Sequence, residues 1–89
     1  MKESLRVAAG VSGPLPRLAT KELLIDGHFV PAGTIVGVGS KLLHFDPVVF
    51  PDPETFVPER WNVDDTVAMD KHVVSYSRGS RSCIGARYV

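Results

Sequence analysis

Cys83 is the only cysteine in the sequence, so it cannot form a disulfide within the chain. A lone cysteine is a candidate functional residue, because its thiolate form can act as a nucleophile or as a metal ligand. To act in either way, the sulfur must lose a proton that a free cysteine holds with a pKa of about 8.5. The plain alternative is a buried, unreactive cysteine, which is common for this residue type. The residues around Cys83 decide between the two interpretations.

Three neighbours of Cys83 favour a metal ligand. Gly79 allows a tight turn that aims backbone N–H groups at the sulfur, and a helix that begins at Cys83 places its positive N-terminal end beside the thiolate. Arg81 offers a planar fork of donors that matches a carboxylate. Gly85 lets the first helical turn pack closely under a flat ring. These neighbours favour a thiolate that binds a metal over a buried, unreactive cysteine.

The segment from Tyr76 to Gly85, YSRGSRSCIG, resembles the haem-binding signature of the cytochrome P450 family, F-x-x-G-x-R-x-C-x-G. Every fixed position matches except the first, where Tyr76 stands in place of phenylalanine. The resemblance implies that Cys83 is the proximal, axial ligand of the haem iron and that Arg81 holds a haem propionate. It also assigns Gly79, Tyr76 and Gly85 to the haem-binding loop, with Tyr76 near the thiolate face. The implied cofactor is haem b, iron protoporphyrin IX.

Two upstream motifs occur in the order that the family requires. Residues 3–6, ESLR, are similar to the E-x-x-R motif of the K helix, and residues 56–61, FVPERW, to the F-x-P-E-R-W block of the meander. The resemblance implies a buried structural charge triad of Glu3, Arg6 and Arg60. Such a triad is costly to break and fixes the register of the chain. The alternative is an exposed helical pair of Glu3 and Arg6 with a solvated loop arginine at position 60.

The intervening sequence is also similar to the family. A G-x-x-[IV]-P-x-G-T hairpin matches residues 27–34 and an H-x-D-P…F-x-[DE]-P stretch matches residues 44–53, so the resemblance covers nearly the whole chain apart from residues 62–72. Residues 10–17 resemble filamentous-fungal members, which commonly carry an arginine at the position of Pro14. That arginine usually helps to hold a propionate, and Arg17 is the candidate substitute in this chain.

Seven prolines and eight glycines divide the chain into short elements. Apolar runs flank an Asp26-Gly27 pair that suits positive φ, which predicts a hairpin. Four prolines in residues 46–61 argue against helix and sheet there, so we expect an ordered meander held by its aromatic side chains. The elements expected before the meander are a helix end (2–9) stopped by Gly10 and Pro14, extended chain (14–20), the hairpin (23–25 and 28–30), a turn (31–33), a strand (34–39) and a helical turn (41–44) capped by Ser40.

The aromatics expected to hold the meander are Phe50, Phe56 and Trp61. After it we expect an acidic surface loop (62–72), an extended piece that runs into a Gly-rich turn (73–83) and the start of a helix (83–89). The fold class that follows is an α+β fragment. The resemblance identifies it as the C-terminal part of the mainly α P450 fold: the end of the K helix, the β-hairpin and strand, the meander, the Cys-ligand loop and the start of the L helix. Residues 1–89 are thus expected to be a partial P450 domain, truncated at both ends, that buries too little apolar surface for a self-sufficient core.

Composition limits the partners of the chain. Ten basic and ten acidic residues give a formal net charge of zero, which argues against binding to nucleic acid. No run of about 18 apolar residues exists, the N-terminus has no apolar signal segment, and a single cysteine suits a reducing compartment. None of the histidines has a His or Cys partner at metal spacing, so a zinc site is not expected and each is interpreted as structural or surface: His28, His44 and His72.

The activity implied by the resemblance is monooxygenation, in which one oxygen atom of O₂ enters an organic substrate. A full-length parent would use haem, O₂, an organic substrate and a redox partner such as a P450 reductase, at the endoplasmic reticulum membrane. The oxygen-activating I helix is not among these residues, so the chain alone is expected to be inactive. Two alternatives remain open: a small haem-binding module without oxygenase activity, and a truncated gene product without independent function.

Overall fold

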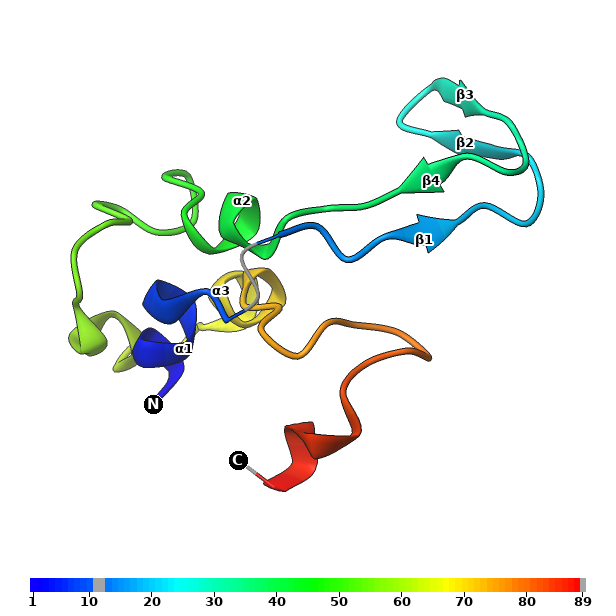
Figure 1. The fold of residues 1–89 in the computed structure, drawn as a ribbon. Coiled ribbons are helices and arrows are strands. Elements are labelled where there is room, and N and C mark those ends of the chain that lie inside the picture. Colours follow the sequence, from blue (N-terminus) through cyan, green and yellow to red (C-terminus); the bar gives the residue numbers. More distant parts are fainter. Residues whose placement is uncertain (11–12, 89) are drawn as a thin grey trace.

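The computed structural model describes residues 1–10 and 13–88. It is a small α+β structure in which short helices gather at one end and paired strands form an arm at the other (Figure 1). This confirms the α+β character predicted from the sequence. The helices are α1 (Lys2–Ala8), α2 (Ser40–His44) and α3 (Val67–His72), with 3-10 helices η1 (Pro58–Trp61) and η2 (Ile84–Tyr88). The strands are β1 (Arg17–Leu18), β2 (Leu23–Ile25), β3 (His28–Val30) and β4 (Ile35–Val36).

The arm consists of two antiparallel strand pairs. β2 pairs with β3 around the turn Asp26-Gly27, with Ile25 opposite His28. The turn residues have φ of 47° at Asp26 and 78° at Gly27, as the two central positions of a type I′ turn require. The hairpin predicted from this residue pair is confirmed.

β1 pairs with β4, and the pairing continues through Ala19. The Ala19 N–H donates to the Thr34 carbonyl at 2.9 Å, and the Gly33 N–H donates to the Ala19 carbonyl at 2.7 Å. Gly33 has φ of 86°, so the turn before β4 depends on glycine. Ala19 is 4% exposed and is the buried apolar residue of the arm.

Gly37 follows β4 where the chain passes close to the segment before β1. A Cβ atom at position 37 would stand 3.2 Å from Pro14 Cβ and 3.3 Å from the Leu15 carbonyl oxygen. Both contacts are tighter than ordinary packing distances. The strand predicted over residues 34–39 is confined to Ile35–Val36, which lie opposite Leu18 and Arg17 of β1.

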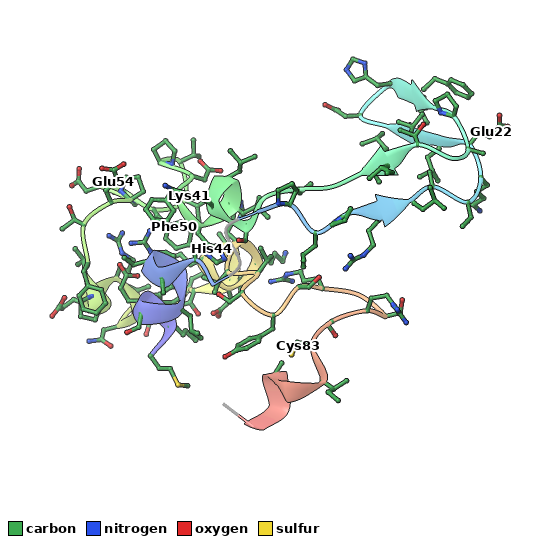
Figure 2. All side chains as sticks on the ribbon, in the orientation of Figure 1. Glu22, Lys41, His44, Phe50, Glu54 and Cys83 are labelled. Carbon is green, nitrogen blue, oxygen red and sulfur yellow. The ribbon has the colours of Figure 1, made fainter. Side chains whose placement is uncertain are left out.

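Polar side chains fill the centre of the helical end. The largest fully buried side chains are Arg6, Phe50, His44 and Glu3, each no more than 1% exposed. Figure 2 shows Phe50 and His44 inside this end of the molecule, away from Cys83. Among the described residues, the buried apolar side chains are only Ala9, Ala19 and Phe50. The buried centre of this end is therefore mainly polar, and its side chains are joined by ion pairs and hydrogen bonds.

The meander over residues 46–61 is held by two aromatic side chains instead of the expected three. The Phe50 ring centroid lies 6.1 Å from that of Trp61, whereas Phe56 is 55% exposed. The expectation that prolines exclude helix from this stretch was also wrong. Pro58 begins η1, where a missing N–H leaves no intrahelical bond unmade.

Residues 62–72 are not the surface loop that their acidic composition predicted, because they contain α3. The side chains before and inside this helix organise its first turn. Asp65 Oδ1 accepts a bond from the Val67 N–H at 3.0 Å, and Thr66 Oγ1 donates to Asp70 Oδ2 at 2.8 Å. Local bonds of this kind start a helix whatever the net charge of the segment.

Two expected helix starts differ from the structure. Ser40 does not cap α2, because Gly39 is the N-cap and Ser40 Oγ donates to the Ala9 carbonyl at 3.2 Å. The chain after Cys83 forms the 3-10 helix η2, which begins at Ile84, and not an α-helix that begins at the cysteine. A full α-helical dipole at the thiol, as expected from the sequence, is therefore not present in the described residues.

The small apolar core predicts that the separate 89-residue chain unfolds without a sharp thermal transition. Circular dichroism on heating should show a gradual loss of signal, and most backbone amides should exchange rapidly with solvent. A cooperative transition with strongly protected amides would contradict this, and would show that the polar cluster alone is sufficient to maintain the fold.

Candidate functional site

A short loop presents Cys83 at the surface. The Cys83 N–H donates to the Tyr76 carbonyl at 2.9 Å, and inside the loop the Ser82 N–H donates to the Gly79 carbonyl at 3.1 Å. The chain has positive φ at Gly79 (82°) and at Ser77 (61°), so it reverses sharply. The Cys83 side chain is exposed and free of disulfide bonds. The loop therefore offers a thiol to a partner outside it.

Gly85 borders the sulfur. A Cβ atom at this position would stand 3.5 Å from Cys83 Sγ, which is an ordinary contact distance. The Ala86 N–H donates to the Cys83 carbonyl at 3.2 Å, so η2 follows the cysteine directly. Bare backbone therefore lies beside the thiol on this side, as close approach of a flat group requires.

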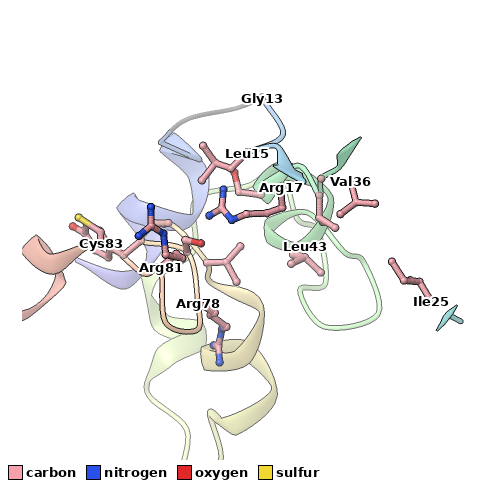
Figure 3. A pocket seen from close by; sticks show the side chains of 16 residues that line it. Gly13, Leu15, Arg17, Ile25, Val36, Leu43, Arg78, Arg81 and Cys83 are labelled. Carbon is pink, nitrogen blue, oxygen red and sulfur yellow. The ribbon is translucent and has the colours of Figure 1, made fainter. Parts of the chain in front are cut away.

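A hollow of about 810 Å³ opens between the Cys83 loop and the β arm (Figure 3). Its volume lies within the range of about 300–1,000 Å³ that is usual for small-molecule sites. Tyr76, Arg81 and Cys83 line it from the loop, while Val36 of β4 and Leu43 of α2 line it from the other elements. The hollow thus joins the thiol to apolar side chains from distant parts of the sequence.

Three arginines and no acidic residue line this hollow, namely Arg17, Arg78 and Arg81. Arg17 donates to the Pro16 carbonyl at 3.0 Å, and Arg78 donates to the Asp70 carbonyl at 2.5 Å. All three side chains are exposed, and across residues 1–10 and 13–88 none of them forms an ion pair. Arg17 and Arg78 each use one donor on a backbone carbonyl, and the remaining guanidinium donors can meet the carboxylates of a ligand.

The donor set fits haem. Cys83 supplies a soft sulfur ligand for iron, the arginines match propionate groups, and Val36 and Leu43 offer apolar surface to a flat ring. In the part of the chain that the structure describes, no group of three or more His, Cys, Asp or Glu side chains could hold a metal ion. The lone thiol is therefore the candidate metal ligand of these residues.

Glu3 lies at the centre of a second, buried site. Arg6 donates to both carboxylate oxygens, from Nη2 to Oε1 at 2.6 Å and from Nε to Oε2 at 2.9 Å. Arg60 Nε donates to Oε1 at 3.1 Å, the Val57 N–H donates to Oε1 at 3.1 Å, and Trp61 Nε1 donates to Oε2 at 2.9 Å. The structure thus brings together Glu3, Arg6 and Arg60, although Arg60 and Glu3 are 57 positions apart in the sequence.

Arg6 uses its whole guanidinium group. Besides its two bonds to Glu3, Nη1 donates to the carbonyls of His44 at 2.9 Å and Pro53 at 2.6 Å, and Nη2 donates to the Thr55 carbonyl at 3.2 Å. A guanidinium has five N–H donors, and these five bonds use all of them. The main chain of α2 and of the meander is therefore wrapped around one side chain of α1.

The charge state of Glu3 follows from these contacts. Burial by itself raises the pKa of this carboxyl group, but the hydrogen bonds from Arg6, the Val57 N–H and Trp61, with the charge of Arg6, act in the opposite direction. The result is a pKa lowered from 4.5 to about 2. Glu3 is therefore ionised throughout the neutral range.

His44 connects the Glu3 site to the segment that leads to Cys83. Its Nδ1 lies 3.1 Å from the Arg6 carbonyl oxygen, and its Nε2 accepts a bond from the Val74 N–H at 2.9 Å. Because a carbonyl cannot donate, Nδ1 carries the proton and the ring is the neutral tautomer. Burial lowers the pKa of His44, the charge of Arg6 lowers it further, and the bond to the Arg6 carbonyl opposes both.

The site residues expected from the sequence thus fall into two places. Those of the hollow and its loop are Cys83, Arg81, Tyr76, Gly79 and Gly85, and those of the buried cluster are Glu3, Arg6 and Arg60. Sequence reasoning missed Trp61 as a donor to Glu3, although it belongs to the matched FVPERW block. It also missed the bridge made by His44, for which the H-x-D-P match was the available signal.

Comparison with known proteins identifies the class. The chain matches the family model described as Cytochrome P450 over residues 1–88. It is 41% identical over 86 residues to Cytochrome P450 monooxygenase aneF of Aspergillus aculeatus and 44% identical over 88 residues to N-acetyltryptophan 6-hydroxylase ivoC of Emericella nidulans. Each alignment covers 96% of this chain and 17% of the relative.

The chain therefore belongs to the cytochrome P450 family, and it spans about 17% of the length of the curated relatives it matches. Its relatives include monooxygenases such as Cytochrome P450 monooxygenase BOT1 of Botryotinia fuckeliana, which is 44% identical over 86 residues. Membership in this family implies haem as the cofactor. Among residues 1–10 and 13–88, no helix has the length and apolar character needed to cross a bilayer.

The lowered pKa of Glu3 predicts that stability falls in acid. The folded pKa lies near 2 and the ordinary value is 4.5, so the unfolded state binds more protons below about pH 4.5. The contribution of Glu3 is fully present above that pH and is lost as the pH falls toward 2, by about 3 kcal/mol. Urea unfolding of the full-length parent should show this loss in wild type and in the exposed-site control Glu59→Gln, but not in Glu3→Gln. Identical acid profiles for all three proteins would contradict the prediction.

The use of all five Arg6 donors predicts that Arg6→Lys damages the parent protein almost as much as Arg6→Ala. An ammonium group has three donors and lacks the planar fork, so at least two buried acceptors lose their partners. We expect a loss of about 3–5 kcal/mol, the usual cost of breaking a buried ion pair, and mostly haem-free protein. Glu3→Ala and Arg60→Ala should give the same phenotype, and their double variant should be no worse than Glu3→Ala alone. Normal folding and haem content in Arg6→Lys would show that the extra bonds to the meander are dispensable.

Proposed function

We propose that these residues are the haem-binding portion of a cytochrome P450 monooxygenase and part of a longer P450 domain. The observation that carries the proposal is an exposed thiol at a hollow lined by three arginines and no acid, in a chain of this family. Cys83 is the proximal ligand of the iron of haem b, and Arg81 holds a propionate. Tyr76, Gly79 and Gly85 form the loop that presents the sulfur.

The elements of the structure take the following places in that domain. α1 is the end of the K helix, and the β arm is the hairpin and strand that follow it. The Pro-rich stretch that ends in η1 is the meander, and residues 76–83 are the Cys-ligand loop. η2 is the start of the L helix. This assignment rests on the order of the motifs and on the family match over residues 1–88.

When bound, the haem iron supplies the redox chemistry that inserts one oxygen atom of O₂ into an organic substrate. The protein residues described above hold and tune it. Cys83 would hold the metal as a thiolate, which would supply electron density to it. The Tyr76 carbonyl fixes the backbone at Cys83 through its bond to the N–H, which keeps the sulfur at one position. Arg81 orients the ring by pairing with a carboxylate.

The buried Glu3 cluster acts on this site through structure and not through chemistry. It joins α1 to η1 and fixes the meander, so that the segments on which the hollow depends keep their register. In a full-length parent, an organic substrate, O₂ and electrons from a redox partner such as a P450 reductase complete the reaction. The family match and the names of the matched monooxygenases support this part of the proposal.

The ligand assignment is tested by Cys83→His in the full-length parent. The reduced carbon monoxide adduct of wild type should show the red-shifted Soret band of thiolate ligation, and Cys83→His should lose that shift. Ser82→Ala is the matched control, since it changes the neighbouring residue and leaves the thiol in place. A histidine-type spectrum in wild type, or a thiolate-type spectrum in Cys83→His, would overturn the assignment of Cys83.

A further inference from the structure

The last turn of α1 is tied to other segments through its carbonyl groups. Carbonyls at the C-terminal end of a helix commonly accept bonds from side chains, and here those of Leu5 and Arg6 also share the Ala9 N–H at 3.2 Å each. Here Ala9 adopts the left-handed conformation with φ of 52°, which ends the helix. The tertiary donors to this turn are Ser75 Oγ on the Leu5 carbonyl (3.2 Å), His44 Nδ1 on the Arg6 carbonyl (3.1 Å) and Ser40 Oγ on the Ala9 carbonyl (3.2 Å).

Two of these contacts hold the segment that leads into the Cys83 loop. His44 bridges the Arg6 carbonyl and the Val74 N–H, and Ser75 bonds directly to α1. The next residue, Tyr76, supplies the carbonyl that receives the Cys83 N–H. A continuous set of bonds therefore runs from the buried arginine through an imidazole to the backbone of the cysteine. Val74 and Ser75 also line the hollow.

We propose that His44 is a positioning residue for the Cys83 loop, which holds residues 74–76 in place while its ring is neutral and releases them when the ring is protonated. This inference rests on the proposed function, in which Cys83 is the iron ligand. The loss of the bridge loosens the loop that presents the sulfur, so thiolate ligation becomes sensitive to mild acid.

The bonding of the ring explains why protonation breaks the bridge. Nδ1 already carries a proton, so the second proton goes to Nε2, the atom that accepts the Val74 N–H. A protonated Nε2 is a donor and repels that N–H. The new charge also lies beside Arg6, whose Nη1 bonds to the His44 carbonyl.

No nearby acid is free to compensate the new charge in the described part of the chain. The carboxylate of Glu3 already receives five hydrogen bonds, and that of Asp46 lies 3.8 Å from His72 Nε2 and accepts the Val48 N–H at 2.9 Å. The charged or titratable side chains of the elements around the ring are Lys2, Glu3 and Arg6 of α1, Lys41 of α2, Asp46 after α2, and Asp70, Lys71 and His72 of α3. Of the further acids, Asp70 is already paired with Lys2 at 2.8 Å. Because burial and Arg6 lower the pKa of His44, the folded state resists the second proton, and its stability decreases as the pH falls below the ordinary histidine value of about 6.5.

The test uses the full-length, haem-loaded protein and the variants His44→Leu and His44→Gln, with His72→Gln as the control. His72 is a half-buried histidine whose Nδ1 bonds within its own helix to Ala68, so it lacks the bridge. Amide hydrogen exchange of Val74 and Cys83 reports the loop directly. The thiolate-type Soret band of the reduced carbon monoxide adduct, followed from neutral pH to about pH 5, reports the ligand over the range in which histidine titrates.

We expect His44→Leu to raise the exchange rate of the Val74 amide about tenfold, with a smaller rise at Cys83. Wild type and His72→Gln should lose the thiolate-type band in mild acid, and this step should be absent in His44→Gln, which cannot be protonated. If His44→Leu does not fold in the cell, the comparison of wild type with His44→Gln still tests whether protonation of His44 causes the acid step.

Unchanged exchange at Val74 and Cys83 in His44→Leu, or the same acid step in His44→Gln as in wild type, would overturn the inference. A wild-type spectrum without thiolate ligation at neutral pH would overturn the proposed function instead. The exchange of the Cys83 amide, measured on the same samples, would then still decide whether His44 holds the loop.

Discussion

The structure depends on one buried carboxylate. Glu3 accepts bonds from Arg6 of its own helix and from Arg60, Trp61 and the Val57 N–H of the distant meander. Removing a carboxylate from water is expensive, and a single ion pair seldom repays that cost. Here the carboxylate meets two guanidiniums and an indole, so its hydrogen-bonding capacity is used fully. The meander has four prolines and little secondary structure, so this carboxylate supplies the order that backbone bonds do not.

The few apolar side chains of the helical end are arranged around the same charges. The guanidinium carbon of Arg6 lies 5.0 Å from the centroid of Phe50 and 5.4 Å from that of Phe45, within the range of cation–π attraction. Phe50 also packs against Trp61, the indole donor to Glu3. Aromatic rings thus surround the ion pair and exclude water from it. Shielding of this kind strengthens each electrostatic contact, because the local dielectric constant is low.

The sequence was most informative where residues act locally or in a fixed spacing. Asp26 and Gly27 predicted the hairpin because both accept positive φ, and the Gly79-to-Gly85 spacing located the thiol loop that the hollow adjoins. Neither residue spacing nor the acidic composition of residues 62–72 indicated α3. The start of this helix depends on side-chain hydrogen bonds of Asp65 and Thr66, which composition does not reveal.

His44 shows a second limit of sequence reasoning. A lone histidine without a His or Cys partner is usually structural, and His44 is buried and structural in this sense. Its importance comes from contacts with Arg6 and Val74, which are 38 and 30 positions away. Such contacts follow from the tertiary fold and leave no local periodicity. Phe56 shows the opposite error: it belongs to a matched motif and was expected to hold the meander, but its side chain is exposed.

Gly37 allows two segments that line the hollow to lie in close contact. The chain before β1 rests against the bare α-carbon at this position, where any side chain would meet Pro14 and Leu15. Leu15 and Gly37 both line the hollow, so this part of its lining depends on contact with a residue that carries only a hydrogen atom. A methyl group at position 37 would push apart the segment before β1 and the segment after β4, both of which are far from the thiol in the sequence. The shape of the hollow is thus determined partly by a residue that has no side chain.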